Sequence, residues 1–212
     1  MEKAKSLKAK NRVFLLGALT ADAVLFALAS VFEQLHFKTS WEILITARSL
    51  LALLLPFVLL LLGSLLPSFV KDILVFWRIK HVLPGHRAFE QKTLTDPRID
   101  QVRLRKNVGA FPTDPGEQNT TWYRLFKKVE TEISIDHVHG QFLLLRDLAA
   151  ISAMLLPGCA IAWLFGSLSN HEAQVLAVIL AGQFILSAVS ARFQGQGLVR
   201  SVLALHGAKR RV

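Results

Sequence analysis

Four long stretches of this 212-residue chain contain almost no charge, and they constrain its fold more than any other feature. They are Val13 to Phe32, Ile43 to Leu66, Leu148 to Leu168 and Ala173 to Ala191, interrupted only by Asp22 and Arg48. A helix rises about 1.5 Å per residue, so each stretch is long enough to cross a hydrocarbon core of about 30 Å. The sequence therefore predicts an all-α integral membrane protein, a four-helix bundle with a small helical cytoplasmic extension.

The first apolar stretch also has features of a secretory signal peptide. Basic residues precede it, and the triplet Ala21-Asp22-Ala23 is similar to a cleavage site. The apolar sequence continues from Val24 to Phe32, however, which makes the stretch long enough to span a bilayer. We therefore interpret it as a retained transmembrane helix.

The positions of the basic residues predict the orientation. Of 25 Lys and Arg residues, five precede Val13, 13 lie between Lys71 and Arg146, and five follow Ala191. Because basic loops stay in the cytoplasm, both termini and the central segment are expected inside a multi-pass protein of the inner (plasma) membrane. The expected parts are a basic N-tail (1–12), helices 1 and 2 (13–70), a helical domain and stalk (71–146), helices 3 and 4 (147–191) and a basic C-tail (192–212).

The formal charge of +10 raises the alternative of a nucleic-acid-binding protein. The central segment contains 13 bases against nine acids, so most of the excess lies next to the apolar stretches. We therefore expect anionic lipid headgroups, rather than nucleic acid, as the partner of these charges. The single cysteine, Cys159, excludes a disulfide within the chain.

An amphipathic segment, residues 68–80, follows the second apolar stretch. Its apolar residues lie about one helical turn apart, which is typical of a helix along the membrane interface. Trp77 and Arg78 are expected to contact headgroups there. Lys209, Arg210 and Arg211 are expected to do the same after Leu198–Leu205, which suits either a short helix on the inner leaflet or a disordered tail.

The central segment contains further helix signals. Asp96-Pro97 and Asp114-Pro115 each place a capping residue before a proline, which predicts helices that begin there, the first ending by Gly109. Further on, apolar residues recur at spacings of four, three and four, the pattern of a helix packed on a partner. This seam consists of Trp122, Phe126, Val129 and Ile133, on a stalk predicted to continue into the third span.

Three polar residues are expected near one depth of the bilayer. They are Asp22, Arg48 and Gln183, in the first, second and fourth spans. A carboxylate at such depth usually faces a polar partner or a water-filled cavity. The layer therefore suits either a pore or proton path, or a bond of Asp22 with Arg48 or Gln183 that holds the bundle together. Arg48 also has the alternative of extending outward to the interface.

Small residues recur every fourth position in the third span, at Gly158, Ala162 and Gly166. Such a ladder lets another helix approach closely, either within the chain or between chains of a homo-oligomer. We expect self-association.

Catalytic and metal-binding patterns are missing from the sequence. It contains no phosphate loop, no GxSxG, no GxGxxG after a strand, no CxxC and no HExxH. His137 and His139 point in different directions on a helix, and His81 and His86 flank a turn. We therefore expect no enzyme activity, no catalytic residue, no bound metal and no cofactor.

Two functional hypotheses follow. The first is an oligomeric membrane effector or channel-like component that is controlled through its cytoplasmic helical domain. In its plan of spans the chain resembles the small multi-span effectors of bacterial antiviral defence systems; this resemblance covers topology and includes no diagnostic motif. The second hypothesis is a non-conducting anchor or scaffold for a cytoplasmic partner protein, which the apolar composition of the spans favours.

Overall fold

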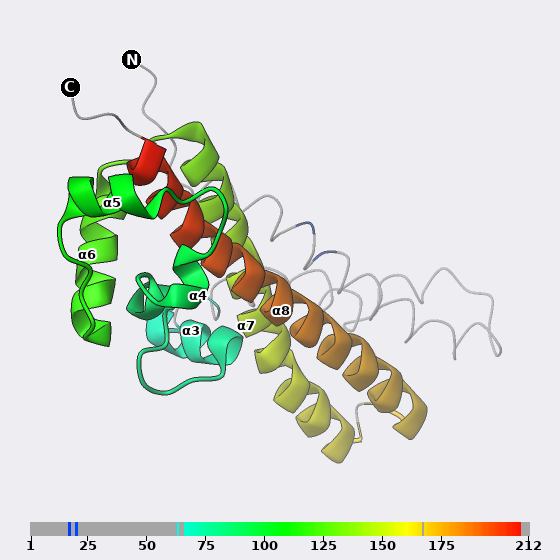
Figure 1. The fold of residues 1–212 in the computed structure, drawn as a ribbon. Helices are drawn as coiled ribbons and strands as arrows, with labels where there is room; N and C mark the ends of the chain where they lie inside the picture. Colours follow the sequence, from blue (N-terminus) through cyan, green and yellow to red (C-terminus); the bar gives the residue numbers. More distant parts are fainter. Residues whose placement is uncertain (1–16, 18–19, 21–62, 64–65, 167, 209–212) are drawn as a thin grey trace. The chain divides into compact units, whose positions relative to one another are not determined.

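The structure is a computed structural model that describes Gly17, Thr20, Gly63 and residues 66–166 and 168–208 (Figure 1). In this part of the chain the regular structure is entirely helical, as the sequence predicts. The elements are α3 (Ser68–Phe76), η2 (Pro84–Arg87), α4 (Gln91–Leu94), α5 (Gln101–Val108), α6 (Pro115–Lys127), α7 (Ile133–Leu164) and α8 (Asn170–Ala208). Apart from Leu66, the first two apolar stretches are described only at Gly17, Thr20 and Gly63.

The third and fourth apolar stretches form α7 and α8, two helices long and apolar enough to cross a membrane. In their most apolar windows only 28% of α7 and 22% of α8 is buried. The core helix of a soluble protein would be mostly buried, so these surfaces suit contact with lipid. The described residues thus contain two candidate spans, and the four-helix bundle goes beyond what they include.

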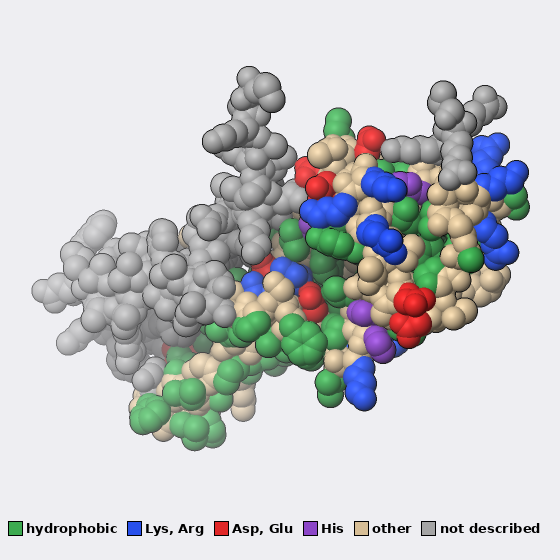
Figure 2. Space-filling view, turned by 90° about the vertical axis from the view of Figure 1, so that its left-hand side faces the viewer, with side chains coloured by type: hydrophobic (Ala, Val, Ile, Leu, Met, Phe, Trp, Pro, Cys, Tyr) green, Lys and Arg blue, Asp and Glu red, His purple; other side chains and the backbone are tan. Residues whose placement is uncertain are grey.

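The chain divides into two compact units. Unit 1 comprises Met1–Lys71 and Arg146–Ser187, and unit 2 comprises Asp72–Leu145 and Ala188–Val212. Only the later part of the predicted stalk continues into the third apolar stretch as one helix, α7, which contains residues of both units. The earlier part belongs to α6, and residues 128–132 form a turn between the two helices. In Figure 2, hydrophobic side chains predominate on the exposed surface of α7 and α8, whereas charged side chains gather on the surface of unit 2.

Unit 2 has its own hydrophobic core, which combines distant parts of the sequence. The buried residues come from the central segment and from α8: Ala88, Phe89, Leu94, Ile99, Leu104, Trp122, Leu125, Phe126, Val129, Ile135, Leu198, Val199, Val202 and Leu203. Residues 198–205 therefore neither lie on the inner leaflet nor form a disordered tail, the two alternatives that the sequence suggested. Their apolar face packs against protein.

The helix starts follow the sequence in one case and not in the other. Asp114 caps α6 as predicted, and its carboxylate accepts a hydrogen bond from the Glu117 amide at 3.0 Å. The prediction for Asp96 is wrong: α5 begins later, and Asp100 caps it by accepting from the Arg103 amide at 2.9 Å. Gly109, with φ of 96°, ends α5 as predicted.

Candidate functional site

The C-terminal end of α8 is held by two hydrogen bonds within unit 2. The Asn107 side chain donates to the backbone carbonyl of His206 at 2.8 Å, which satisfies a carbonyl at the helix end. The imidazole of His206, itself buried, lies with its Nε2 atom 3.0 Å from the Leu125 carbonyl at the end of α6. We refer to Asn107, Leu125 and His206 as the α8 clamp.

Close backbone packing adds to this clamp. A Cβ atom at Gly207 would lie 3.2 Å from the Asp100 carbonyl oxygen, at the start of α5. Because backbone atoms cannot move aside as a flexible side chain does, only glycine fits this approach without a shift. Figure 1 shows the red end of α8 next to α5.

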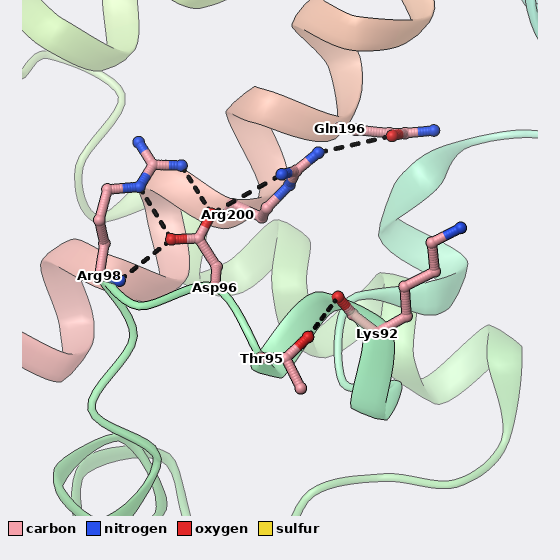
Figure 3. A network of polar contacts seen from close by, with 6 residues as sticks. All are labelled: Lys92, Thr95, Asp96, Arg98, Gln196 and Arg200. Carbon is pink, nitrogen blue, oxygen red and sulfur yellow. Dashed lines mark hydrogen bonds and ion pairs between the residues drawn. The ribbon is translucent and has the colours of Figure 1, made fainter.

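A charged network fixes the segment before α5 to α8 (Figure 3). Arg98 donates two hydrogen bonds from its guanidinium to the Asp96 carboxylate, each 2.9 Å long, and Arg200 of α8 lies 3.7 Å from the same carboxylate. The hydrogen bonds from Arg98, and then the charges of both arginines, hold the pKa of Asp96 well below its usual range. The network thus keeps its carboxylate ionised.

An open groove of about 1190 Å³ runs along α6 and the loop before it, and its lining includes Asn107 and Leu125 of the α8 clamp. Its lining combines apolar surface, from Phe111 and Tyr123, with both signs of charge, from Glu117, Arg124 and Lys128. Aromatic surface next to separate acidic and basic groups suits a polypeptide segment better than a small metabolite. The groove is therefore the candidate partner site of unit 2.

Unit 1 contains a buried charge cluster next to the apolar part of α7. The Lys71 ammonium lies 3.0 Å from the Asp147 carboxylate, and the Arg146 guanidinium lies 3.4 Å from the same oxygen. Lys71 and Arg146 are 8% and 6% exposed. The Asp147 carboxylate thus pairs with two buried cations.

The proposed polar layer falls mostly outside the described residues, because Asp22 and Arg48 are not among them. Gln183 is half-buried on α8 in unit 1. The predicted headgroup contacts Lys209, Arg210 and Arg211 also lie outside the described residues.

The ladder of small residues is shorter on α7 than the sequence suggests. Gly158 is exposed and Ala162 is half-buried on this helix. Gly166 lies beyond the helix end at Leu164, in the turn toward α8, with φ of 69°. Its glycine therefore serves the left-handed conformation of that turn rather than a helix contact.

Three of the four seam residues pack as the spacing indicates. Trp122, Phe126 and Val129 are buried in the core of unit 2, and the rings of Trp122 and Phe126 stack with centroids 5.5 Å apart. Ile133 is 88% exposed, contrary to expectation. The helix is interrupted by a turn at residues 128–132, so the periodicity that joined Ile133 to the seam does not hold across it.

Trp77 and Arg78 follow the end of α3, which is shorter than the predicted segment 68–80. Both side chains are exposed, and the guanidinium of Arg192 stacks on the Trp77 ring, with its carbon 3.6 Å from the centroid. No local sequence pattern indicates this role of Arg192, because the contact joins residues far apart in the chain. Asn107 and His206 were missed for the same reason.

Among the described residues, no group of three or more His, Cys, Asp or Glu side chains is placed to hold a metal ion. No protein-family model, no curated protein and no solved structure matches this chain.

Proposed function

We propose that the chain is a multi-span inner-membrane protein, an oligomeric effector or channel-like component that is controlled through unit 2. The supporting observation is that α7 and α8 each combine a candidate span with part of the unit 2 core. Ile135 of α7 and Leu203 of α8, both fully buried, belong to that core. A change in unit 2 that displaces either residue also acts on the helix that continues into the apolar region.

The length of α8 supports this coupling. Its 39 residues extend about 58 Å at 1.5 Å per residue, well beyond a hydrocarbon core of about 30 Å. A passive tether needs only a flexible linker between anchor and domain. A continuous helix clamped at its end by Asn107 and His206 instead transmits movement.

The orientation that we propose places both termini and unit 2 in the cytoplasm, because 23 of the 25 basic residues lie on that side. Reporters fused at Gly116 and Val212 are expected to be cytoplasmic, and one fused at Thr39 external. Labelling of a cysteine introduced at Gly116 by an impermeant reagent from outside would contradict this topology.

Flux measurements test the effector function directly. We expect vesicles containing the protein to pass ions or dye, and Asp22→Asn to abolish or alter this flux while expression and assembly stay normal. Asn107→Ala removes one bond of the α8 clamp and is expected to change the flux as well. Asn119→Ala is the matched control, because it removes the same amide from unit 2 without touching the clamp.

The non-conducting anchor or scaffold is the second candidate, and two contacts favour it. The hydroxyls of Ser152 and Ser187 hydrogen-bond to carbonyls of their own helices, those of Leu148 and Gln183, rather than providing polar groups to a pore. The groove on unit 2 offers a surface for a cytoplasmic partner. Absence of flux in wild type and every variant, with correct topology, would reject the channel and leave the anchor.

A further inference from the structure

A cationic cluster surrounds Trp77 in unit 2. The guanidinium of Arg192 lies on the Trp77 ring, with its carbon 3.6 Å from the centroid, and its Nε atom donates to the Val75 carbonyl. These two contacts fix the guanidinium plane. Its Nη2 atom is buried and has no hydrogen-bond partner among the described residues, which is costly for a charged donor.

The loop that follows Trp77 has an unusual backbone. Trp77 and His81, with φ of 51° and 49°, are the only non-glycine residues in the described part of the chain with positive φ. A side chain in this conformation is strained, and such strain is concentrated at binding sites. The loop is held in place by Arg87, which donates to the His81 carbonyl at 3.2 Å.

The cluster combines three cations, Arg78, Arg87 and Arg192. Arg78 lies close enough to Arg87 and Arg192 to act on both through its charge. Within the described residues, none of the three forms an ion pair with a carboxylate, and Glu90 is the acid that acts on Arg87 from a distance. The charge of Arg78 thus acts unfavourably on both Arg87 and Arg192, and such a group of cations favours a bound anion.

The surroundings indicate which anion. Arg192 follows the apolar stretch Ala173–Ala191 directly, and the side chains next to the cations are apolar and exposed: Trp77 by 56%, Ile79 by 79% and Phe193 by 67%. Exposed Trp beside Arg is typical of the level at which a protein meets lipid headgroups. A site for a soluble anion has no need of this apolar rim.

We propose that Arg78, Arg87 and Arg192, grouped around Trp77, bind the phosphate group of an anionic lipid headgroup. Guanidinium groups bind phosphate oxygens through paired N–H donors, and the exposed side chain of Arg78 offers such donors, while Arg87 and Arg192 add charge. The inference rests on the proposed membrane location. It adds a defined lipid site on unit 2 to that proposal.

The test uses the full chain, purified in mild detergent without added lipid. Dioleoyl-phosphatidylglycerol, dioleoyl-phosphatidylcholine and inorganic phosphate are titrated separately, while thermal unfolding and bound lipid are measured, the latter by native mass spectrometry. We expect phosphatidylglycerol to bind at least tenfold more tightly than phosphatidylcholine. We also expect no stabilisation by inorganic phosphate at the concentration where phosphatidylglycerol saturates.

Two variants and a control locate the site. Arg78→Gln removes an exposed cation and is expected to weaken phosphatidylglycerol binding about fivefold, the contribution of one base near an anionic surface. Arg192→Lys keeps the charge but loses the planar fork, so we expect it to reduce the lipid preference too. Lys106→Gln, which replaces an exposed base of α5, is the control and is expected to bind within twofold of wild type.

Several results would overturn the proposal. Unchanged phosphatidylglycerol binding in Arg78→Gln would do so even if Arg192→Lys failed to fold. Equal protection by inorganic phosphate would assign the cluster to soluble anions instead. If the lipid preference is absent while the topology reporters still place the chain in the membrane, this inference fails and the proposed function stands.

Discussion

Replacing Leu203 by alanine tests whether the end of α8 belongs to the core of unit 2. The side chain is fully buried, and the substitution removes three carbon atoms. At about 0.8 kcal/mol per buried CH₂, transfer alone costs roughly 2.4 kcal/mol, and the remaining cavity brings the total to about 3 kcal/mol. We expect the free energy of unfolding of unit 2 to fall by this amount.

Thermal unfolding of the full chain in mild detergent measures the effect. Unit 2 contains about 100 residues, for which 1 kcal/mol shifts the Tm by about 4–8 °C, so we expect a decrease of about 12–24 °C. Fluorescence of Trp122, buried in the same core, and hydrogen exchange of α6 amides report on unit 2.

Val102→Ala is the matched control, because Val102 is 68% exposed on α5, and its loss is expected to stay within about 0.5 kcal/mol. Equal Tm values for Leu203→Ala and Val102→Ala would refute the packing of α8 in this core. They would return residues 198–205 to a place on the lipid surface.

Three further substitutions test the charged and small residues. Asp147→Asn removes the carboxylate that pairs with the buried Lys71 and is expected to destabilise unit 1 by about 3–5 kcal/mol in thermal unfolding, with partial recovery when Lys71→Met is added; an unchanged Tm would contradict the buried cluster. Asp96→Asn should cost at most about 1 kcal/mol at pH 7, because Arg98 is exposed. Since folding lowers the pKa of Asp96, its contribution exists above the unfolded pKa of about 3.9 and declines as pH falls toward the folded pKa, so the gap between wild type and variant in denaturant titrations should narrow below pH about 4; a constant gap would argue against the network. Gly158→Leu should disperse a homo-oligomer in size-exclusion chromatography without unfolding the chain, because a Cβ there meets no atom within 4 Å; an unchanged oligomer would exclude this face from the interface.

The sequence predicts those features that depend on local chemistry. Uninterrupted apolar composition was sufficient for α7 and α8, and the Asp114-Pro115 pair was sufficient for the start of α6. The same pair at Asp96 failed because the local pattern does not show that the Asp96 carboxylate is engaged by Arg98 and Arg200 instead. A capping signal shows what a side chain is able to do, and the tertiary fold determines which partner it takes.

Amphipathic patterns predicted helices but not the surface against which their apolar faces pack. The apolar face of Leu198–Leu205 suits lipid and protein equally well, so periodicity alone does not distinguish the inner leaflet from the core. The spacing of Ile133 was correct for a continuous helix, but the turn before it changes the face on which it lies. The α8 clamp joins Asn107 to a residue 99 positions away, and no local pattern contains that information.

The order of synthesis gives the unit 2 core a particular consequence. Most of the core residues precede α7, but Leu198, Val199, Val202 and Leu203 are made only after α7 and the apolar stretch Ala173–Ala191 have been translated. The earlier residues therefore have an incomplete core until the C-terminal part of α8 has been made. Assembly of unit 2 thus depends on α8: a chain in which residues 198–203 do not reach this core leaves the apolar residues around Trp122 uncovered, where quality-control proteases recognise them.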